Sequence, residues 1–126
     1  MSKAGLALGF KGEGLACDFL IDNGYKIIKR NYRTKLGQID IIAKDKDTLC
    51  FIEVKTRTSD MAGLPEEAIT VIKQRKISKI ALIYLKENQL LNKRARFDVV
   101  SILFNEGGFK INLIKDAFEL GGSYAY

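Results

Sequence analysis

LGQIDIIAK (residues 36–44) and TLCFIEVKT (residues 48–56) are two apolar segments that decide the fold of this chain. Both are rich in the β-branched and aromatic side chains that favour strands. The short polar stretch Lys44-Asp45-Lys46-Asp47 lies between them and predicts a hairpin. Residues 49–54 are apolar on both faces, so we predict that the second strand is covered on both sides and lies at the centre of a sheet.

Three ionisable side chains interrupt these two strands. Side chains alternate along a strand, so Glu53 and Lys55 point to the same face. If the hairpin loop has an even number of residues, Asp40 shares that face and lies opposite or diagonal to Glu53. Gathering acids in an apolar setting costs free energy and therefore points to a function. A structural ion pair, Glu53 with Lys55 or Asp40 with Arg57, is the alternative explanation.

A divalent metal ion would account for the two carboxylates. Mg²⁺ prefers oxygen ligands and is usually held by one or two carboxylates together with substrate phosphate. Asp40 and Glu53 would be these ligands, and the backbone carbonyl of Val54 could be a third. Lys55 could orient an attacking water or stabilise developing negative charge. Two carboxylates fit Mg²⁺ and Mn²⁺ equally well.

A helix is predicted before these strands, from Leu6 to Asn23, and Gly24 suits its C-terminal cap. At about 100° per residue its apolar side chains form one stripe, made up of Leu6, Phe10, Cys17, Leu20 and Ile21. Glu13 falls within this stripe, and we expect its helix to pack on the same face of the sheet as Glu53. An acid in a core-facing position requires compensation by a metal, a cation or hydrogen-bond donors, unless it reaches the rim or pairs with a lysine.

The other predicted elements complete a mixed α/β fold. Residues 25–31 mix apolar and basic positions, as a strand near a sheet edge does. After a loop at residues 57–64, Pro65-Glu66-Glu67 opens a helical turn and a long helix covers residues 70–87. Strands are predicted at residues 96–104 and 109–114. The order α-β-β-β-α-β-β predicts a mixed central sheet flanked by helices, with one domain over residues 1–120 and a frayed tail at 121–126.

Basic residues outnumber acidic ones, 21 to 15, and they are clustered. Clustered cations suit a polyanion because each phosphate contact releases condensed counterions. A solvated basic surface is the alternative. The candidate nucleic-acid-binding residues come from the predicted edge strand, the end of the central strand and the start of the long helix: Lys29, Arg30, Arg33, Lys35, Arg57, Lys73, Arg75 and Lys76.

Several classes of protein are excluded or disfavoured by composition. The chain has no histidine, which excludes histidine-based general bases, catalytic triads and metal ligands. Cys17 and Cys50 lie far apart without CxxC spacing, so we expect two buried free thiols rather than a zinc site. The apolar runs are too short to span a bilayer, and the first residues lack the apolar core of a secretory signal. We therefore expect a cytoplasmic protein.

The segment from Gly37 to Asp40, followed by Phe51-Ile52-Glu53-Val54-Lys55-Thr56-Arg57, resembles the PD-(D/E)xK nuclease signature. More closely, nearly the whole chain resembles the YraN family of bacterial predicted endonucleases. That family is similar to archaeal Holliday-junction resolvases and has the restriction-endonuclease-like fold. The other matching motifs, in chain order, are Gly12-Glu13 with Ala16, Gly24-Tyr25, Arg30-Asn31-Tyr32-Arg33, Pro65-Glu66-Glu67-Ala68, Lys73-Gln74-Arg75-Lys76 and Arg96-Phe97-Asp98-Val99-Val100.

This resemblance implies a metal site formed by Asp40 and Glu53, with Lys55 catalytic and Glu13 assisting. It also implies that Gln74, near the start of the long helix, approaches the site. The sequence departs from the family pattern at Gln38, where we expect glutamate, and an amide does not supply the charge that a second metal would require.

The leading functional hypothesis is a metal-dependent endonuclease that acts on DNA, on branched or repair intermediates in particular. A homodimer would suit junction cleavage, since two symmetric cuts need two sites. A DNA-binding module that keeps the nuclease fold without turnover is the second hypothesis. A protein–protein adaptor, suggested only by the apolar sheet, is the third.

Overall fold

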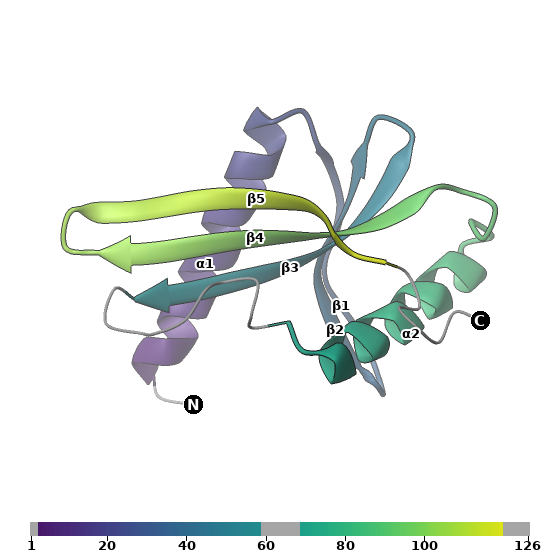
Figure 1. Cartoon of the computed structure of the whole chain (residues 1–126), viewed down its shortest axis with the longest axis horizontal. Coiled ribbons are helices and arrows are strands. Elements are labelled where there is room, and N and C mark those ends of the chain that lie inside the picture. The colour runs from purple at the N-terminus through teal and green to yellow at the C-terminus, as the bar shows by residue number, and fades with distance from the viewer. Residues whose placement is uncertain (1–2, 59–68, 120–126) are drawn as a thin grey trace.

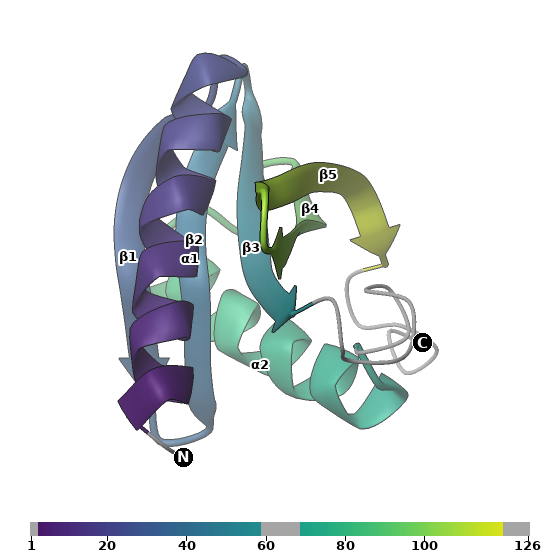
Figure 2. The same ribbon diagram turned by 90° about the vertical axis from the view of Figure 1, so that its left-hand side faces the viewer.

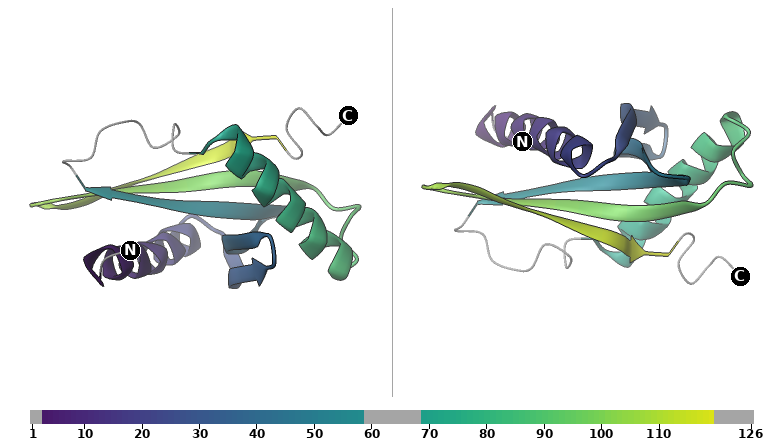
Figure 3. Two further views of the ribbon diagram at one scale, coloured as in Figure 1. Left: turned by 90° about the horizontal axis from the view of Figure 1, so that it is seen from below. Right: turned by 90° about the horizontal axis from the view of Figure 1, so that it is seen from above.

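A five-stranded mixed sheet with an α-helix on each face forms the structure (Figures 1 and 3). The structure is a computed structural model that describes residues 3–58 and 69–119. In chain order the elements are α1 (Lys3–Asp22), β1 (Lys26–Thr34), β2 (Gly37–Asp45), β3 (Thr48–Thr58), α2 (Val71–Glu87), β4 (Ala95–Asn105) and β5 (Gly108–Phe118).

The predicted fold class and the order α-β-β-β-α-β-β are confirmed. Three strands extend further than predicted: β1 continues to Thr34, β3 to Thr58 and β5 to Phe118. The reason is pairing, because β4 is partnered along its length and Thr58 still lies opposite Phe104. The predicted helical turn at residues 65–67 and the tail at 121–126 lie outside the described residues.

The sheet order β1-β2-β3-β4-β5 places β3 at the centre and β1 at an edge, as predicted from their patterns. Three of the four pairings are antiparallel, and β3 and β4 are parallel. A parallel pair requires a crossover connection, and α2 supplies it. Within the described residues, no helix has the length and apolar composition that a membrane crossing requires.

The hairpin between β2 and β3 has the geometry on which the candidate site depends. Asp45 pairs with Thr48, which leaves a two-residue turn and satisfies the even-loop condition. The ladder runs from this pair to Ile41 opposite Ile52 and stops there. Beyond that point β2 diverges from β3, and in Figure 1 the β1–β2 hairpin crosses away from the three strands β3, β4 and β5. We call this divergence, which begins at Asp40 of β2 and Glu53 of β3, the fork.

The two faces of the sheet bury separate apolar clusters. On one face α2 covers Phe51 and Leu49 with a helical stripe made up of Ile77, Ile80, Ala81, Tyr84 and Leu85. On the other face, where α1 lies in front of β1 and β2 in Figure 2, this helix covers Cys50 and Ile52 with Ala16, Cys17 and Leu20. Glycine at position 24 has φ of 89°, in the left-handed region, and closes α1 as predicted.

The side chains of Leu6 and Phe10 in the predicted α1 stripe lie outside the described residues. Among its described members, Cys17, Leu20 and Ile21, one is placed differently. Ile21 is 55 % exposed, so its assignment to the buried stripe was wrong. The sheet contacts a narrower face of the helix than the periodicity suggested, and Ile21 falls on the flank of that face. Leu20, directly before it, is fully buried.

Candidate active site

Asp40 lies at the fork and is 92 % buried, being 8 % exposed. Its Oδ2 atom accepts a hydrogen bond of 2.8 Å from the backbone N–H of Val54. A side-chain carboxylate therefore accepts the hydrogen bond of a strand N–H at the point where the β2–β3 ladder has ended. The Oδ1 atom accepts a bond of 3.0 Å from Nε2 of Gln38. These two donors fix the orientation of the carboxylate while leaving lone pairs on both oxygens.

Glu53 follows directly in β3, and the β2–β3 register extended by one step places it opposite Asp40. The predicted co-facial arrangement of the two acids is thus the one that this register gives. The Glu53 side chain is 11 % exposed. Burial and the negative charge of Asp40 together raise its pKa from 4.5 to about 7, against the opposing effect of nearby lysines.

Lys73 provides the strongest of those opposing effects. Its Nζ atom lies 2.7 Å from Oε1 of Glu53, in a direct ion pair between α2 and β3. This ion pair is not the Glu53–Lys55 pair considered from the sequence, whereas the pair of Asp40 with Arg57 stays a prediction. Helical periodicity does not reveal this contact, because it depends on where the first turn of α2 docks against the sheet.

Lys55 is half-buried and shares the Glu53 face of β3 by strand alternation. Burial lowers the pKa of its ammonium group, and the positive charge of Lys73 lowers it further. The negative charges of Glu53 and Asp40 act in the opposite direction. Lys55 therefore belongs to the same electrostatic cluster as the two acids.

Glu13 comes from α1, on the opposite face of the sheet from α2 (Figure 3). The expectation that this helix packs on the same face as Glu53 was wrong. Even so, the negative charge of Asp40 is close enough to raise the pKa of Glu13, and only burial raises it more. The fork explains this proximity, because beyond Ile41 no ladder between β2 and β3 separates the two faces.

The Oε1 atom of Glu13 is buried and has no hydrogen-bond partner. The nearest cation to it is Arg30 of β1, whose guanidinium lies 4.0 Å away. Asn31 and the positive charges of Arg30 and Arg33 lower the pKa of Glu13 and so partly offset its burial. A buried carboxylate oxygen without a donor is costly, and such an atom marks a place where a cation or an ordered water fits.

Gln74 does not contact the acids in the described structure. Its Nε2 atom donates to the backbone carbonyl of Ile69 at 3.0 Å, at the start of α2. Thr70 caps the same helix end by accepting from the backbone N–H of Lys73. Gln74 thus supports the turn that presents Lys73 to Glu53.

The predicted nucleic-acid-binding residues divide into two groups. Arg30, Arg33, Arg57 and Lys73 act electrostatically on the acids or on Lys55. The others are exposed on β1, on the β1–β2 turn and on α2: Lys29, Lys35, Arg75 and Lys76. The aliphatic chain of Lys76 lies over Gly37 and so brings α2 next to the β1–β2 turn.

The acids at the fork fit a divalent ion held mainly by substrate and water. Among residues 3–58 and 69–119, no three acidic or cysteine side chains converge as ligands of one ion. Asp40 and Glu53 would therefore act as a pair, a number that suits Mg²⁺. Burial, reinforced by the charge of Asp40, raises the pKa of Glu53, and the Oε1 atom of Glu13 has no hydrogen-bond donor.

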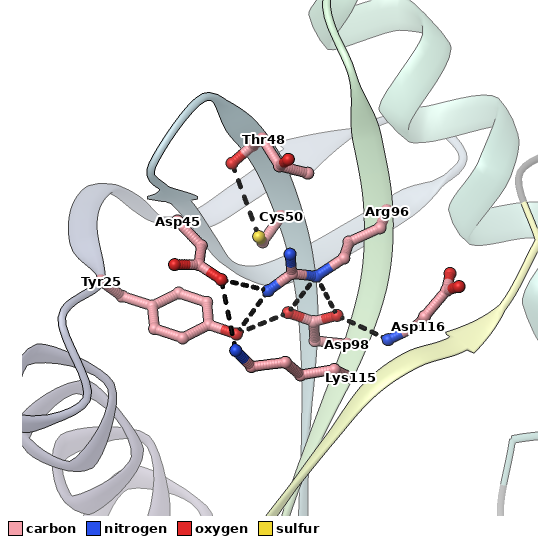
Figure 4. A network of polar contacts seen from close by, with 8 residues as sticks. All are labelled: Tyr25, Asp45, Thr48, Cys50, Arg96, Asp98, Lys115 and Asp116. Atoms are coloured by element: carbon pink, nitrogen blue, oxygen red, sulfur yellow. Dashed lines mark hydrogen bonds and ion pairs between the residues drawn. The ribbon is translucent and has the colours of Figure 1, made fainter.

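A second charged network lies on the face of the sheet that α1 covers, where Asp98 of β4 is opposite Ile52 of β3, and it is structural (Figure 4). Asp98, fully buried, accepts hydrogen bonds from Tyr25, from Arg96 and from the backbone N–H of Asp116. Arg96 also contacts Asp45 at 2.7 Å. The network joins the end of α1 to β2, β4 and β5.

Comparison with known proteins decides the family. The model of the uncharacterised protein family UPF0102 matches residues 12–102. This chain belongs to the UPF0102 family. The match contains every residue of the fork site named above, from Glu13 to Gln74, and it agrees with the resemblance stated from the sequence.

Individual UPF0102 relatives match over most of their length. A UPF0102 protein from Syntrophus aciditrophicus is 50 % identical over 115 residues, which cover 91 % of each chain. One from Geobacter metallireducens is 49 % identical over 95 % of this chain and 98 % of its own. One from Geotalea uraniireducens is 48 % identical over 90 % and 91 %. Their names state the family and no activity.

Proposed function

We propose that this UPF0102 protein is a metal-dependent endonuclease that hydrolyses phosphodiester bonds in DNA. The observation that carries the proposal is the cluster at the fork. Asp40 and Glu53 lie at facing positions with Lys55 on the same face, and the pKa of Glu53 is raised to about 7 by burial and by Asp40. Perturbed acids beside a lysine are typical of hydrolytic sites.

Each residue has a separate task in this proposal. Asp40 and Glu53 would hold Mg²⁺ or Mn²⁺, and the carbonyl of Val54 is a further candidate ligand. The ion, when bound, would supply polarisation of the scissile phosphate and a water of lowered pKa. Lys55 would stabilise the negative charge that develops on the phosphate oxygens. Glu13 would accept a hydrogen bond from a water molecule through its unpaired Oε1 atom.

The basic residues around the fork would bind the substrate backbone. Arg30 and Arg33 lie on the Glu13 side, whereas Lys73 and Lys76 lie on α2. Phosphate contacts fix the position of a strand without reading its sequence. We therefore propose recognition of DNA shape, with branched or flapped DNA as the preferred substrate.

A cleavage assay tests the proposal. Purified protein is incubated with labelled linear, flap and four-way DNA in Mg²⁺, Mn²⁺ or chelator. Metal-dependent products are expected from the wild type and should be lost in Glu53→Gln and in Lys55→Met. Glu106→Gln and Lys110→Met, on the exposed β4–β5 hairpin, are the matched controls and should cleave normally. Cleavage that survives Glu53→Gln contradicts the assignment.

Two observations favour a second candidate, a DNA-binding module without turnover. The ammonium group of Lys73 already neutralises Glu53 at 2.7 Å, and Gln38 lies beside Asp40 where a charged residue would strengthen metal binding. This candidate predicts salt-sensitive DNA binding with no metal-dependent product. If this candidate is right, Lys73→Met should fail to cleave DNA just as the wild type does.

Symmetric cleavage of a four-way junction would require two copies of the site. We therefore propose a homodimer on such a substrate. Sedimentation of the protein alone and with junction DNA distinguishes a preformed dimer from one assembled on DNA. Only single nicks, made by a monomer, would restrict the substrate to flaps or linear DNA.

A further inference from the structure

A groove on the α2 side of the molecule lies outside the candidate active site. It has a volume of about 570 Å³ and is bounded by β1, the β2–β3 hairpin and the turn that follows α2. Its lining residues are Ile28, Lys44, Asp47, Leu49, Leu90, Asn92, Lys93 and Arg94. None of these residues belongs to the fork, and Leu49 is four residues from Glu53 along β3, or roughly 13 Å.

The groove has an aliphatic floor that the sheet geometry helps to form. Pairing between β1 and β2 shifts register between Ile27 and Lys29, so Ile28 is the bulged residue. A bulge re-aims a side chain, and this one leaves Ile28 43 % exposed at the groove. Leu49 and Leu90 complete the floor.

The wall after α2 is held in place by backbone hydrogen bonds. Leu90 donates to the carbonyl of Leu85 at 2.7 Å, and Lys93 donates to that of Leu90 at 3.0 Å. The N–H of Leu49 in β3 donates to the carbonyl of Arg94 at 2.9 Å. The groove is therefore preformed, which reduces the entropic cost of binding a ligand.

The rim of the groove is positively charged. Lys44, Lys93 and Arg94 are exposed cations, and Asp47 is the one acid among the lining residues. Lys26 lies opposite Lys44 in the β1–β2 register and adds to the same side. An aliphatic floor beneath such a rim is complementary to a ligand that combines negative charge with large apolar side chains.

We propose that this groove binds an acidic peptide segment of a partner protein, in which one or two large apolar side chains follow or precede carboxylates. The apolar side chains would occupy the floor formed by Ile28, Leu49 and Leu90. The carboxylates would pair with Lys93, Arg94 and Lys44. Because the groove and the fork share no lining residue, the partner can bind while the fork site is engaged.

Nucleic acid fits this groove less well than a peptide. Strands bound without duplex structure stack their bases on aromatic side chains, and the lining contains none. Asp47 at the rim would repel a continuous phosphate backbone. Binding of a strand at this groove is nevertheless an outcome that the experiment below separates.

The test is a selection of short random peptides displayed on phage against the full-length protein. Bound phage are counter-selected on the double variant Lys93→Glu with Arg94→Glu. Peptides that carry acids next to leucine, isoleucine or phenylalanine are expected to be enriched. Synthetic copies should bind the double variant at least about tenfold more weakly in fluorescence polarisation.

Two matched controls separate the groove from general charge and exposure. Lys79→Glu with Lys110→Glu makes the same change in net charge at exposed positions away from the groove and should leave peptide affinity unchanged. Ile28→Ser should weaken binding, whereas Ile72→Ser, 75 % exposed on α2, should not. Circular dichroism confirms that each variant is folded.

Three results would overturn the proposal: no enriched peptide, enriched peptides without acids, or equal loss of affinity in the charge-matched control. Labelled single-stranded DNA is measured in parallel. If the groove variant loses DNA binding and no peptide depends on the groove, the groove binds nucleic acid instead.

Discussion

Gly12 is the residue that allows α1 to approach β3 closely beside Glu13. A Cβ atom at this position would overlap with Cγ2 of Thr56. Gly12→Ala is therefore expected to destabilise the protein by about 1–3 kcal/mol through overpacking. The free energy of unfolding is measured in urea.

Gly14 provides the control in the same helix. A Cβ atom there meets no atom within 4 Å, so Gly14→Ala should stabilise the helix by up to about 1 kcal/mol. Alanine at position 12 should thus lower the free energy of unfolding, and alanine at position 14, in the same helical turn, should raise it. Equal effects would contradict the close approach of α1 to Thr56.

Glu53 is the residue whose replacement should remove the response to metal. Mg²⁺ or Mn²⁺ at a hundred times its dissociation constant would stabilise the wild type by about 2.7 kcal/mol. Glu53→Gln should abolish the resulting rise in melting temperature, and Glu106→Gln should preserve it. An undiminished rise in the Glu53 variant would place the ion elsewhere.

The residues of the candidate site were predictable to different degrees. Asp40, Glu53 and Lys55 followed from strand alternation and an even hairpin loop, which are local rules. Lys73 was expected to bind nucleic acid, and Gln74 was expected to approach the site. Adjacent helical positions differ by about 100°, so the docking of α2 decides which one faces β3, and that docking is tertiary.

Asp98, opposite Ile52 on the α1 face of the sheet, joins β4 to β5 and to the segment that follows α1. This carboxylate is completely buried and accepts from Tyr25, Arg96 and the N–H of Asp116. Removing one member of a buried ion pair leaves an uncompensated charge. Asp98→Ala should therefore destabilise the protein by about 3–5 kcal/mol in urea unfolding.

Asp98 lies close to the fork but on the opposite face of the sheet from Glu53, and this gives a second part to that prediction. Folded Asp98→Ala protein, at low temperature, should keep the wild-type affinity for Mn²⁺ in calorimetry. Loss of metal binding in the folded variant would show that the two faces of the sheet are coupled.

Asp45 connects the β2–β3 hairpin to Arg96 and should give stability a dependence on acid pH. The hydrogen bond from Arg96 is the main effect that lowers the pKa of Asp45 below its ordinary value of 3.8. A lowered pKa means that the contribution to stability is present above pH 3.8 and is lost as pH falls through the folded-state pKa.

The variant Asp45→Asn tests this dependence. It should be less stable than the wild type near pH 6, and the difference should narrow as pH falls below about 4. Asp47→Asn, in the same hairpin, is the control. A constant difference across this pH range would contradict the role assigned to the Arg96–Asp45 bond.

At the level of elements, the sequence was sufficient for order and type but not for extent or placement. Apolar periodicity identified both helices and all the strands of the described sheet. The ends of β3 and β5 are set by pairing with β4, which local composition does not encode. The side on which α1 packs depends on the path of the chain between α1 and β1, so it was not available from the helix pattern.

The whole molecule has a formal net charge of +6, which should dominate any association with DNA. The logarithm of the binding constant is expected to fall linearly with the logarithm of salt concentration. Lys76→Ala should reduce the slope by about 0.9, the amount for one phosphate contact. Lys110→Ala removes the same charge far from the fork on β5 and should leave the slope unchanged. Equal slopes for both variants would show that Lys76 of α2 makes no phosphate contact with DNA.

Both cysteines of the chain are buried, Cys17 at 7 % and Cys50 at 0 % exposure, and burial raises the pKa of the Cys50 thiol to about 12. In the native state neither should react with maleimide dyes. A cysteine introduced at Lys35 would then be the single labelled position, and the absence of tryptophan leaves the emission spectrum free for one introduced indole. The wild-type chain is thus already a background for energy-transfer measurements between protein and DNA.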